Sequence, residues 1–389
     1  MLRNITWIIG LSRSRAQIEG KPWVRERPWS VGYAKDNVNF SHHFVVAEQL
    51  LGERRIEEAL AEFDFAEREG HDPDLCSAGR WTCMMLTGRF EAAWRESDLI
   101  AKRGKPDPHS FWDGQPCYGR RVLIRCLHGL GDTIQFVRYA SLLRGIAASV
   151  SIEAQPLLKE LLGLSGLADH VFTWNEPEPA WDQQIEIIEL PRVFRTTLGS
   201  IPARVPYLFA PGGPGCAADS GFRVGLVWCS SAYDPARNIP LELAGQLCSL
   251  AEVQFHSLQA DPGRAGLQRC VLPIQDVYDP SGSVIAAARS LQKMDLLITV
   301  DTMMAHLAGA LARPVWTLLP YQADWRWMLD RDDSPWYPTM RLFRQTSSGD
   351  WQGVIDRVRN ELERHCQTVA GLADVSTVER GSAAPGSVK

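Results

Sequence analysis

Apolar segments alternate with polar turns along most of this chain, and the period of that alternation changes part-way. Between residues 44 and 103, apolar positions recur at the three- and four-residue spacing of amphipathic helices. From residue 121 onward, short apolar runs that fit buried strands alternate with helical patterns. Such a rhythm indicates a mostly parallel sheet with helices on its faces. The sequence therefore predicts a helical segment followed by an α/β fold.

The helical segment contains an internal repeat. The pattern that begins at Leu50 recurs 34 positions later at Met84, with the small residues Ala59 and Ala93 in matching places. This period is typical of tetratricopeptide helix pairs, although two unrelated amphipathic helices would show the same pattern. Because about three repeats are usually needed for a self-supporting array, we expect residues 44–105 to lean on the next domain.

Two α/β halves follow, and stretches rich in proline and glycine separate them. One such stretch begins at Pro106, and another is centred on Pro211-Gly-Gly-Pro-Gly215. The predicted units are an N-terminal extension of uncertain role (1–43), tetratricopeptide-like helices (44–105), a Rossmann-like acceptor domain (106–210), a Rossmann-like donor domain (220–366) and a disordered tail (367–389). The expected strands are 121–127, 149–153, 170–174, 185–190, 222–228, 253–258, 296–300 and 315–319. The expected helices of the α/β part are 133–143, 156–162, 241–250, 284–291, 303–311 and 351–365.

Composition and charge exclude several classes of protein. The formal net charge is −5, and no basic stripe interleaved with aromatic residues is present, so we expect no nucleic-acid partner. The nine cysteines include no C-x-x-C pair, which argues against a zinc site or a disulfide framework and for reduced thiols in the cytoplasm. No apolar run approaches the roughly 20 residues of a transmembrane helix.

Two strand-to-helix junctions carry the candidate chemistry. The first runs from Arg121 to Thr133 and includes Asp132, and the second runs from Leu296 to Gly309 and includes His306. A helix N-terminus presents unpaired N–H groups and a partial positive charge, so it suits an anionic ligand. Ligands of open α/β sheets bind beyond the carboxyl ends of the strands, where both junctions lie. Two such junctions facing one cleft would bind a phosphorylated donor and activate an acceptor.

Asp132 is the informative residue of the first junction. Gly129-Leu-Gly131 lacks the third glycine of a dinucleotide fingerprint, since position 134 is isoleucine, and no Walker lysine follows. A carboxylate that opens a helix is either an N-cap or, at a strand end beside two glycines, a general base for an acceptor hydroxyl. Gln135 and Arg138 fall on the following turns, where they would flank the acceptor together with Gly131.

The second junction leaves the same two interpretations open. Asp301 suits a cap, while Thr302 and the next amides suit a phosphate. His306 lies four residues after Thr302 on the same helix face, either as a structural residue or as a ligand-binding one. Arg237 follows a polar loop and is either solvated or able to neutralise a leaving diphosphate without a metal. No second histidine or cysteine lies at metal spacing, so no metal site is expected.

These motifs resemble those of a known family. The strand followed by Gly129-Leu-Gly-Asp132, together with the run from Asp301-Thr302 through His306-Leu-Ala-Gly-Ala-Leu to Pro314-Val315, resembles the heptosyltransferase-like glycosyltransferases of family 9. The match is closer still to bacterial proteins that join tetratricopeptide repeats to such a domain. Those proteins carry versions of the segments 129–139, 324–327 and 334–338, and the resemblance covers about residues 46–365.

The resemblance implies a GT-B fold, in which two Rossmann-like domains enclose the site and the C-terminal one binds the donor. It implies a nucleotide-diphosphate sugar as donor, inverting transfer without an obligatory metal or cofactor, and a glycan, lipopolysaccharide or protein as acceptor. Asp132 matches the proposed base of the family. Asp301, Thr302 and His306 match its donor-diphosphate loop, and Arg237 matches a basic residue before Ile239.

One loop departs from the family pattern. Relatives usually read Ala-Gly-Asn-Pro after the residue equivalent to Trp228 and continue with polar residues, whereas this chain has a shorter loop over Cys229–Asp234. The departure leaves a second interpretation open. In that interpretation the chain is a non-catalytic scaffold that binds a protein partner through its repeat helices and at most a nucleotide in the cleft.

Overall fold

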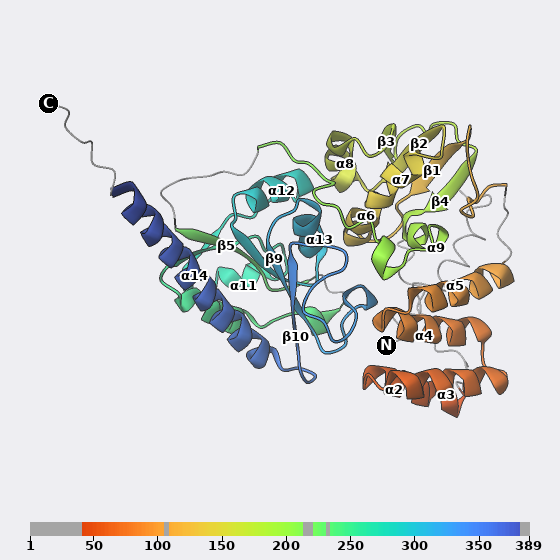
Figure 1. Cartoon of the computed structure of the whole chain (residues 1–389), viewed down its shortest axis with the longest axis horizontal. Coiled ribbons are helices and arrows are strands. Elements are labelled where there is room, and N and C mark those ends of the chain that lie inside the picture. The colour runs from red at the N-terminus through yellow and green to blue at the C-terminus, as the bar shows by residue number, and fades with distance from the viewer. Residues whose placement is uncertain (1–40, 105–108, 213–220, 231–233, 382–389) are drawn as a thin grey trace.

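The computed structural model describes residues 41–104, 109–212, 221–230 and 234–381 of the chain. Within these ranges a layer of helices packs beside two α/β domains, each built on a parallel sheet (Figure 1). The mixed α/β class with parallel sheets is thus confirmed. Nearly all of the predicted N-terminal extension, residues 1–40, lies outside the described residues. Within the described residues, no helix combines the length and the apolar character that crossing a bilayer requires.

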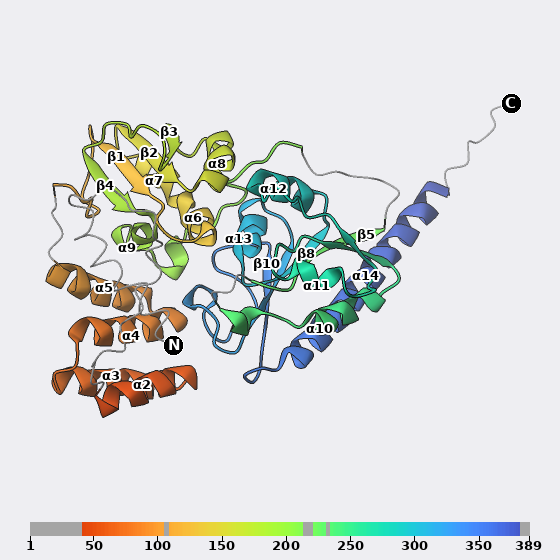
Figure 2. The ribbon, with the colours of Figure 1, turned by 180° about the vertical axis from the view of Figure 1, so that it is seen from behind.

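The helical layer consists of two helix pairs stacked on one another (Figure 2). Ser41 begins the first helix by accepting a hydrogen bond from the Phe44 amide at 3.3 Å. Gly79 is needed for close approach, because an added Cβ atom would lie 2.3 Å from the ring of Phe63. The predicted helices of this segment are therefore present, and their relation to tetratricopeptide repeats stays a prediction. The helices are α2 (His42–Gly52), α3 (Ile56–Arg68), α4 (Pro73–Leu86) and α5 (Phe90–Gly104).

The first α/β domain has a four-stranded parallel sheet in the order β3-β2-β1-β4. The expected strand at 185–190 is corrected: it ends at Glu186, and the chain turns into helix there. The reason is that Glu186 pairs with Arg125, the last residue of the neighbouring strand, so no partner backbone lies beyond it. The strands are β1 (Arg121–Arg125), β2 (Ser149–Ala154), β3 (His170–Thr173) and β4 (Gln183–Glu186).

The second α/β domain has a six-stranded parallel sheet in the order β10-β9-β8-β5-β6-β7. The sequence did not predict its two edge strands. One of them is only three residues long, and the other carries Arg341, which pairs at 2.6 Å with Glu361 on the closing helix. The strands are β5 (Phe222–Val227), β6 (Val253–Ser257), β7 (Ile274–Asp276), β8 (Leu296–Val300), β9 (Val315–Leu319) and β10 (Met340–Arg344).

Helices cover both sheets, and several of them differ from the prediction: 3-10 turns make up part of the expected helices 156–162 and 241–250, and α9 and α11 were not predicted. The expected helix at 133–143 begins earlier, at Leu130, and a 3-10 turn interrupts it. The closing helix runs to Gly381, so the first part of the predicted disordered tail 367–389 is helical. No proline lies within this helix to interrupt it, and the next proline along the chain is Pro385. The helices are α6 (Leu130–Phe136), α7 (Ala140–Arg144), α8 (Lys159–Ser165), α9 (Leu190–Val193), α10 (Leu241–Gly245), α11 (Arg264–Leu267), α12 (Val284–Gln292), α13 (Met303–Ala310) and α14 (Trp351–Gly381).

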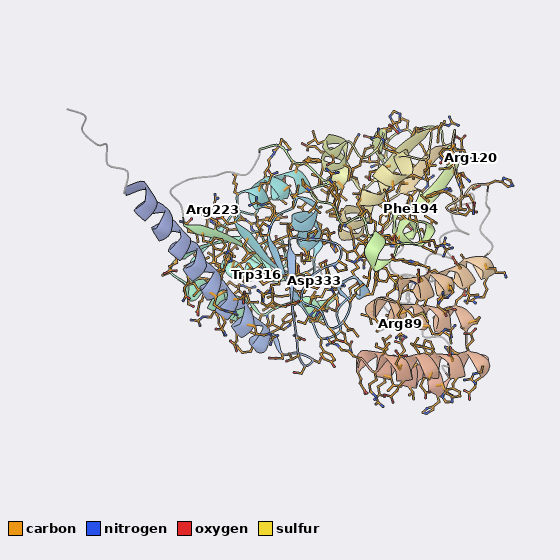
Figure 3. All side chains as sticks on the ribbon, viewed as in Figure 1. Arg89, Arg120, Phe194, Arg223, Trp316 and Asp333 are labelled. Atoms are coloured by element: carbon orange, nitrogen blue, oxygen red, sulfur yellow. The ribbon has the colours of Figure 1, made fainter. Side chains whose placement is uncertain are left out.

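The helical layer packs against both α/β domains. Trp94 donates its indole N–H to the Thr196 carbonyl of the first domain at 2.6 Å. Trp81 meets Trp325 of the second domain edge-on, with ring centroids 5.2 Å apart. Side chains fill the molecule throughout: Figure 3 places Arg89 in the helical layer, while Phe194 and Trp316 belong to the first and second domains. The short helical array therefore leans on the rest of the chain, as its length led us to expect.

Candidate functional site

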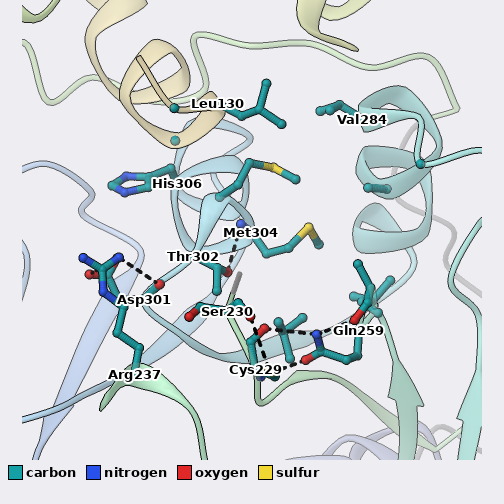
Figure 4. Close-up of a pocket in the computed structure, with 18 of the residues that line it drawn as sticks. Leu130, Cys229, Ser230, Arg237, Gln259, Val284, Asp301, Thr302, Met304 and His306 are labelled. Atoms are coloured by element: carbon teal, nitrogen blue, oxygen red, sulfur yellow. Dashed lines mark hydrogen bonds and ion pairs between the residues drawn. The ribbon is translucent and has the colours of Figure 1, made fainter. Parts of the chain in front are cut away.

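A cavity of about 710 Å³ lies between the two α/β domains, and both strand-to-helix junctions line it. From the first domain come residues 128–132, at the start of α6. From the second come the loops after β5, β6 and β7, the β8–α13 junction, and the 3-10 turn η8 (Trp325–Trp327). Figure 4 shows this wall, with His306 close to the start of α6. The structure thus brings residues about 170 positions apart in the chain to one site, as 301 and 132 differ by 169.

Asp132 lies at the third helical position of α6, and Gly129 is the N-cap residue. Its Oδ2 atom accepts a hydrogen bond from the Gly129 amide at 3.0 Å, which closes the first turn. Its Oδ1 atom forms an ion pair with the Arg326 guanidinium. Asp132 is therefore not the N-cap, and both of its oxygens have partners in this structure.

Gly131 allows the two junctions to touch. A Cβ atom added at this position would lie 2.9 Å from Cδ2 of His306 and 3.7 Å from Cα of Met303. Only a residue without a side chain lets the first turn of α6 approach α13 this closely. Gly131 lines the cavity, as the predicted acceptor side requires.

The β8–α13 junction places a threonine cap beside a buried ion pair. The Thr302 hydroxyl accepts a hydrogen bond from the Met304 amide at 3.2 Å, so part of the helix start is already capped by the chain. Arg237 reaches Oδ2 of Asp301 at 3.3 Å (Figure 4). Burial raises the pKa of Asp301, and the Arg237 cation opposes that shift. Asp301, Thr302 and Arg237 all line the cavity.

His306 is a neutral member of the cavity wall. Its Nδ1 atom forms a hydrogen bond with the Tyr337 hydroxyl at 3.0 Å, and its ring stacks on Trp327 with centroids 5.3 Å apart. Burial, reinforced by the nearby Arg326 cation, lowers the pKa of His306 to about 3. At neutral pH the imidazole therefore offers hydrogen bonding to a ligand but no positive charge.

The structure corrects two predicted acceptor-side residues. Gln135 and Arg138 are buried and do not belong to the cavity wall. Gln135 Oε1 accepts a hydrogen bond from Arg326 Nε at 2.6 Å. Arg138 donates to the Trp336 carbonyl at 2.7 Å and to the Tyr207 hydroxyl at 2.8 Å. Because α6 begins at Leu130, these side chains point into the packing between the domains, where they have a structural role.

Two charged residues that we did not single out as site residues, Arg326 and Asp324, also line the cavity. Arg326 contacts Asp132 and also pairs with Asp324 at 2.9 Å. Burial opposes ionisation of Asp324, but the Arg326 and Arg237 cations prevail and lower its pKa. The signal for both was present in the sequence, because segment 324–327 is one of the motifs that carry the family resemblance.

Carboxylates outnumber guanidinium groups in this wall. Asp132, Asp301 and Asp324 face the guanidinium groups of Arg237 and Arg326. Asp234 also pairs with Arg237 at 3.4 Å, and Asp261 and Asp279 line the cavity as well. In the part of the chain that the structure describes, no cluster of three or more histidine, cysteine or acidic side chains has an arrangement that would hold a metal ion.

Comparisons with known proteins give distant similarities. No protein-family model matches this chain. Protein FlbA of Caulobacter vibrioides is 23% identical over 382 residues; the match covers 86% of this chain but only 62% of the relative, less than two thirds of its length.

Two similar solved structures are glycosyltransferases by name. The family 9 glycosyltransferase of Veillonella parvula is 10% identical with a TM-score of 0.46, and the match covers 65% of this chain and 97% of that one. The ADP-heptose LPS heptosyltransferase II of E. coli is 12% identical with a TM-score of 0.48, over 64% of this chain and 99% of that one.

Proposed function

We propose that this protein is a glycosyltransferase that transfers a sugar from a nucleoside diphosphate donor to a hydroxyl of a glycan, lipopolysaccharide or protein acceptor. One observation carries the proposal: Asp132 of the first domain and the Arg237–Asp301–Thr302 group of the second line the same cavity of about 710 Å³. That volume suits a small-molecule ligand, for which sites of about 300–1,000 Å³ are usual. Parts of the motifs that resemble family 9 enzymes, residues 129–132, 301–304, 306 and 324–326, contribute to this same wall.

In the proposed complex the second domain holds the donor. The diphosphate lies against the start of α13, where Thr302 and the helix dipole favour an anion. Arg237 supplies charge-assisted hydrogen bonds to the phosphate oxygens. The neutral His306 contributes hydrogen bonding only, because its pKa lies far below physiological pH.

The proposed reaction is a single inverting displacement that needs no metal and no cofactor. The Asp132 carboxylate takes the proton of the acceptor hydroxyl while the hydroxyl oxygen attacks the anomeric carbon of the sugar. The bond between that carbon and the β-phosphate oxygen breaks on the opposite face, and the electron pair leaves with the diphosphate. Arg237 and the helix start stabilise the charge that develops on the leaving group.

Incubation with a panel of nucleotide sugars tests the proposal. We expect at least one of the ADP-, UDP-, GDP- and dTDP-sugars to raise the melting temperature and to release the nucleoside diphosphate once an acceptor is added. The D132N variant should keep its circular dichroism spectrum and lose turnover by about 10²-fold or more. Unchanged turnover in D132N would remove the base assignment.

One observation favours the alternative of a non-catalytic nucleotide-binding or scaffold protein. Both oxygens of Asp132 are engaged, one by Arg326 and one by the Gly129 amide, so the carboxylate is not free to take a proton in this conformation. Thermal stabilisation by a nucleotide sugar without release of nucleoside diphosphate would support this alternative.

A further inference from the structure

The ion pair between Asp132 and Arg326 joins the two α/β domains across the cavity wall. Asp132 comes from the start of α6 in the first domain, and Arg326 comes from η8 in the second. The proposed reaction requires this pair to open, because Arg326 occupies Oδ1 of Asp132 and the Gly129 amide occupies Oδ2, which leaves neither oxygen open to an acceptor hydroxyl. A ligand or a conformational change must therefore break the ion pair between Asp132 and Arg326 before the reaction.

Arg326 is held in place by more than Asp132. Its Nε atom donates to Gln135 at 2.6 Å, and Nη1 pairs with Asp324 at 2.9 Å. Its guanidinium carbon also lies 5.0 Å from the ring centroid of Trp325 and 5.4 Å from that of Phe136. These contacts fix the guanidinium whether or not the carboxylate of Asp132 is bound to it, so one anionic partner can replace another without a large movement.

The charge of the cavity favours an exchange of partners. Carboxylates such as Asp132, Asp301 and Asp324 already outnumber the guanidinium groups of Arg237 and Arg326, and a diphosphate adds further negative charge. An anion enters such a cavity more favourably if it replaces an anion already bound to a cation.

Of the two carboxylates that pair with Arg326, Asp132 is the one placed to leave. Its side chain is 22% exposed, against 11% for Asp324. Each carboxylate accepts one backbone hydrogen bond at 3.0 Å, but Asp324 uses the same Oδ1 atom for the amide and for Arg326, whereas Asp132 binds the Gly129 amide through Oδ2 and Arg326 through Oδ1. Release into the solvated cavity therefore costs less for Asp132 than for Asp324.

We propose that the donor diphosphate and Asp132 compete for the Arg326 guanidinium, so that donor binding frees Oδ1 of the carboxylate while Oδ2 keeps its hydrogen bond from the Gly129 amide. The inference rests on the proposed function and deepens it: Arg326 is a donor-binding residue, and the protein binds its donor before Asp132 becomes active. The ion pair keeps Asp132 engaged until a donor is present.

A double-mutant cycle measured by nucleoside diphosphate binding tests the competition without needing turnover. ADP, UDP and GDP are titrated calorimetrically into wild type, D132N, R326Q and the double variant. D132N removes the competitor and should tighten binding about tenfold. R326Q should weaken binding about tenfold, and in that background D132N should change it by less than about twofold. The cycle separates competition for Arg326 from a general loss of negative charge, which would act equally in both backgrounds.

Two further variants serve as controls for the double-mutant cycle. D333N is the matched control, because Asp333 is 66% exposed and pairs at 2.6 Å with Arg331 outside the cavity; its affinity should equal that of wild type. R326M, whose apolar stem fits beside Trp325 and Phe136, provides a second background in case R326Q does not fold. Equal tightening by D132N in all backgrounds, or none, overturns the inference and leaves the proposed function standing. If wild type binds no nucleoside diphosphate at concentrations up to about 1 mM, both the proposed function and the inference are contradicted.

Discussion

Gly131 and His306 touch across the two domains: a Cβ atom at Gly131 would stand 2.9 Å from Cδ2 of the imidazole. The imidazole is held in place on its other sides, because it stacks on Trp327 and is hydrogen-bonded to Tyr337. This contact sets how closely the two helix starts approach and therefore the shape of the cavity between them.

The G131A variant should accordingly be destabilised although alanine favours helix. The overlap with His306 forces α6 and α13 apart, and overpacking of this kind costs about 1–3 kcal/mol. Gly163 is the matched control: it lies in α8, and an added Cβ atom would have no neighbour within 4 Å. G163A should raise stability by about 0.5–1 kcal/mol. Urea unfolding of both variants measures the difference, and equal behaviour would disprove the close contact.

The buried His306 makes stability depend on pH. In the folded protein its pKa is lowered to about 3, whereas the imidazole in an unfolded chain titrates near 6.5. Below pH 6.5 the unfolded state therefore binds a proton that the folded state does not, and this residue reduces stability by up to about 1.4 kcal/mol per pH unit. Above pH 6.5 it has no such effect.

Comparison of wild type with H306Q isolates this contribution. His71 and His256, whose pKa values burial also lowers, titrate in both proteins and cancel in the difference. From pH 7 to pH 5, the free energy of unfolding should decrease more in wild type than in H306Q. Parallel curves over that interval would show that folding does not lower the pKa of His306.

Trp81 supports the site from the helical layer. Its ring is 1% exposed and meets Trp325, the residue next to Arg326, with centroids 5.2 Å apart. W81A should cost about 3–5 kcal/mol through the cavity it leaves and should increase amide exchange in η8. W174A is the control, since Trp174 is 53% exposed and its truncation should change little. Unaltered exchange in η8 would mean that the helical layer does not support Arg326.

Arg80 stabilises the helical layer through a buried ion pair. Its side chain is 9% exposed and pairs at 3.0 Å with Glu96, which is 12% exposed. It also pairs with the more exposed Glu67 at 2.6 Å and Asp64 at 3.2 Å, carboxylates that water can solvate once Arg80 is removed. R80M should cost about 3–5 kcal/mol, because it leaves the Glu96 carboxylate buried without its partner. The double variant R80M/E96M should recover most of that loss, since two apolar groups replace the pair. Denaturant unfolding of both variants measures their free energies of unfolding. A double variant that is no more stable than R80M would contradict the prediction.

The amino-acid sequence determined the parts of this protein that depend on local pattern. The strand at 296–300 and the strand at 315–319 have the predicted ends, because continuous apolar runs between turns leave little choice of register or type. Asp132 and Asp301 were found for the same reason: both follow buried strands of parallel sheets, and the carboxyl ends of such strands form the ligand edge.

Only the tertiary structure decided which faces meet. Arg326 reaches Asp132 across 194 positions of the chain, and no local pattern encodes that pairing. Gln135 and Arg138 have the spacing of cavity residues, yet the packing of α6 against the second domain turns them inward. The edge strands β7 and β10 form because a neighbouring strand offers free backbone groups, not because their own residues alternate strongly. Period and capping are properties of a few adjacent residues, whereas burial and ion pairing depend on surfaces that come together only when the chain folds.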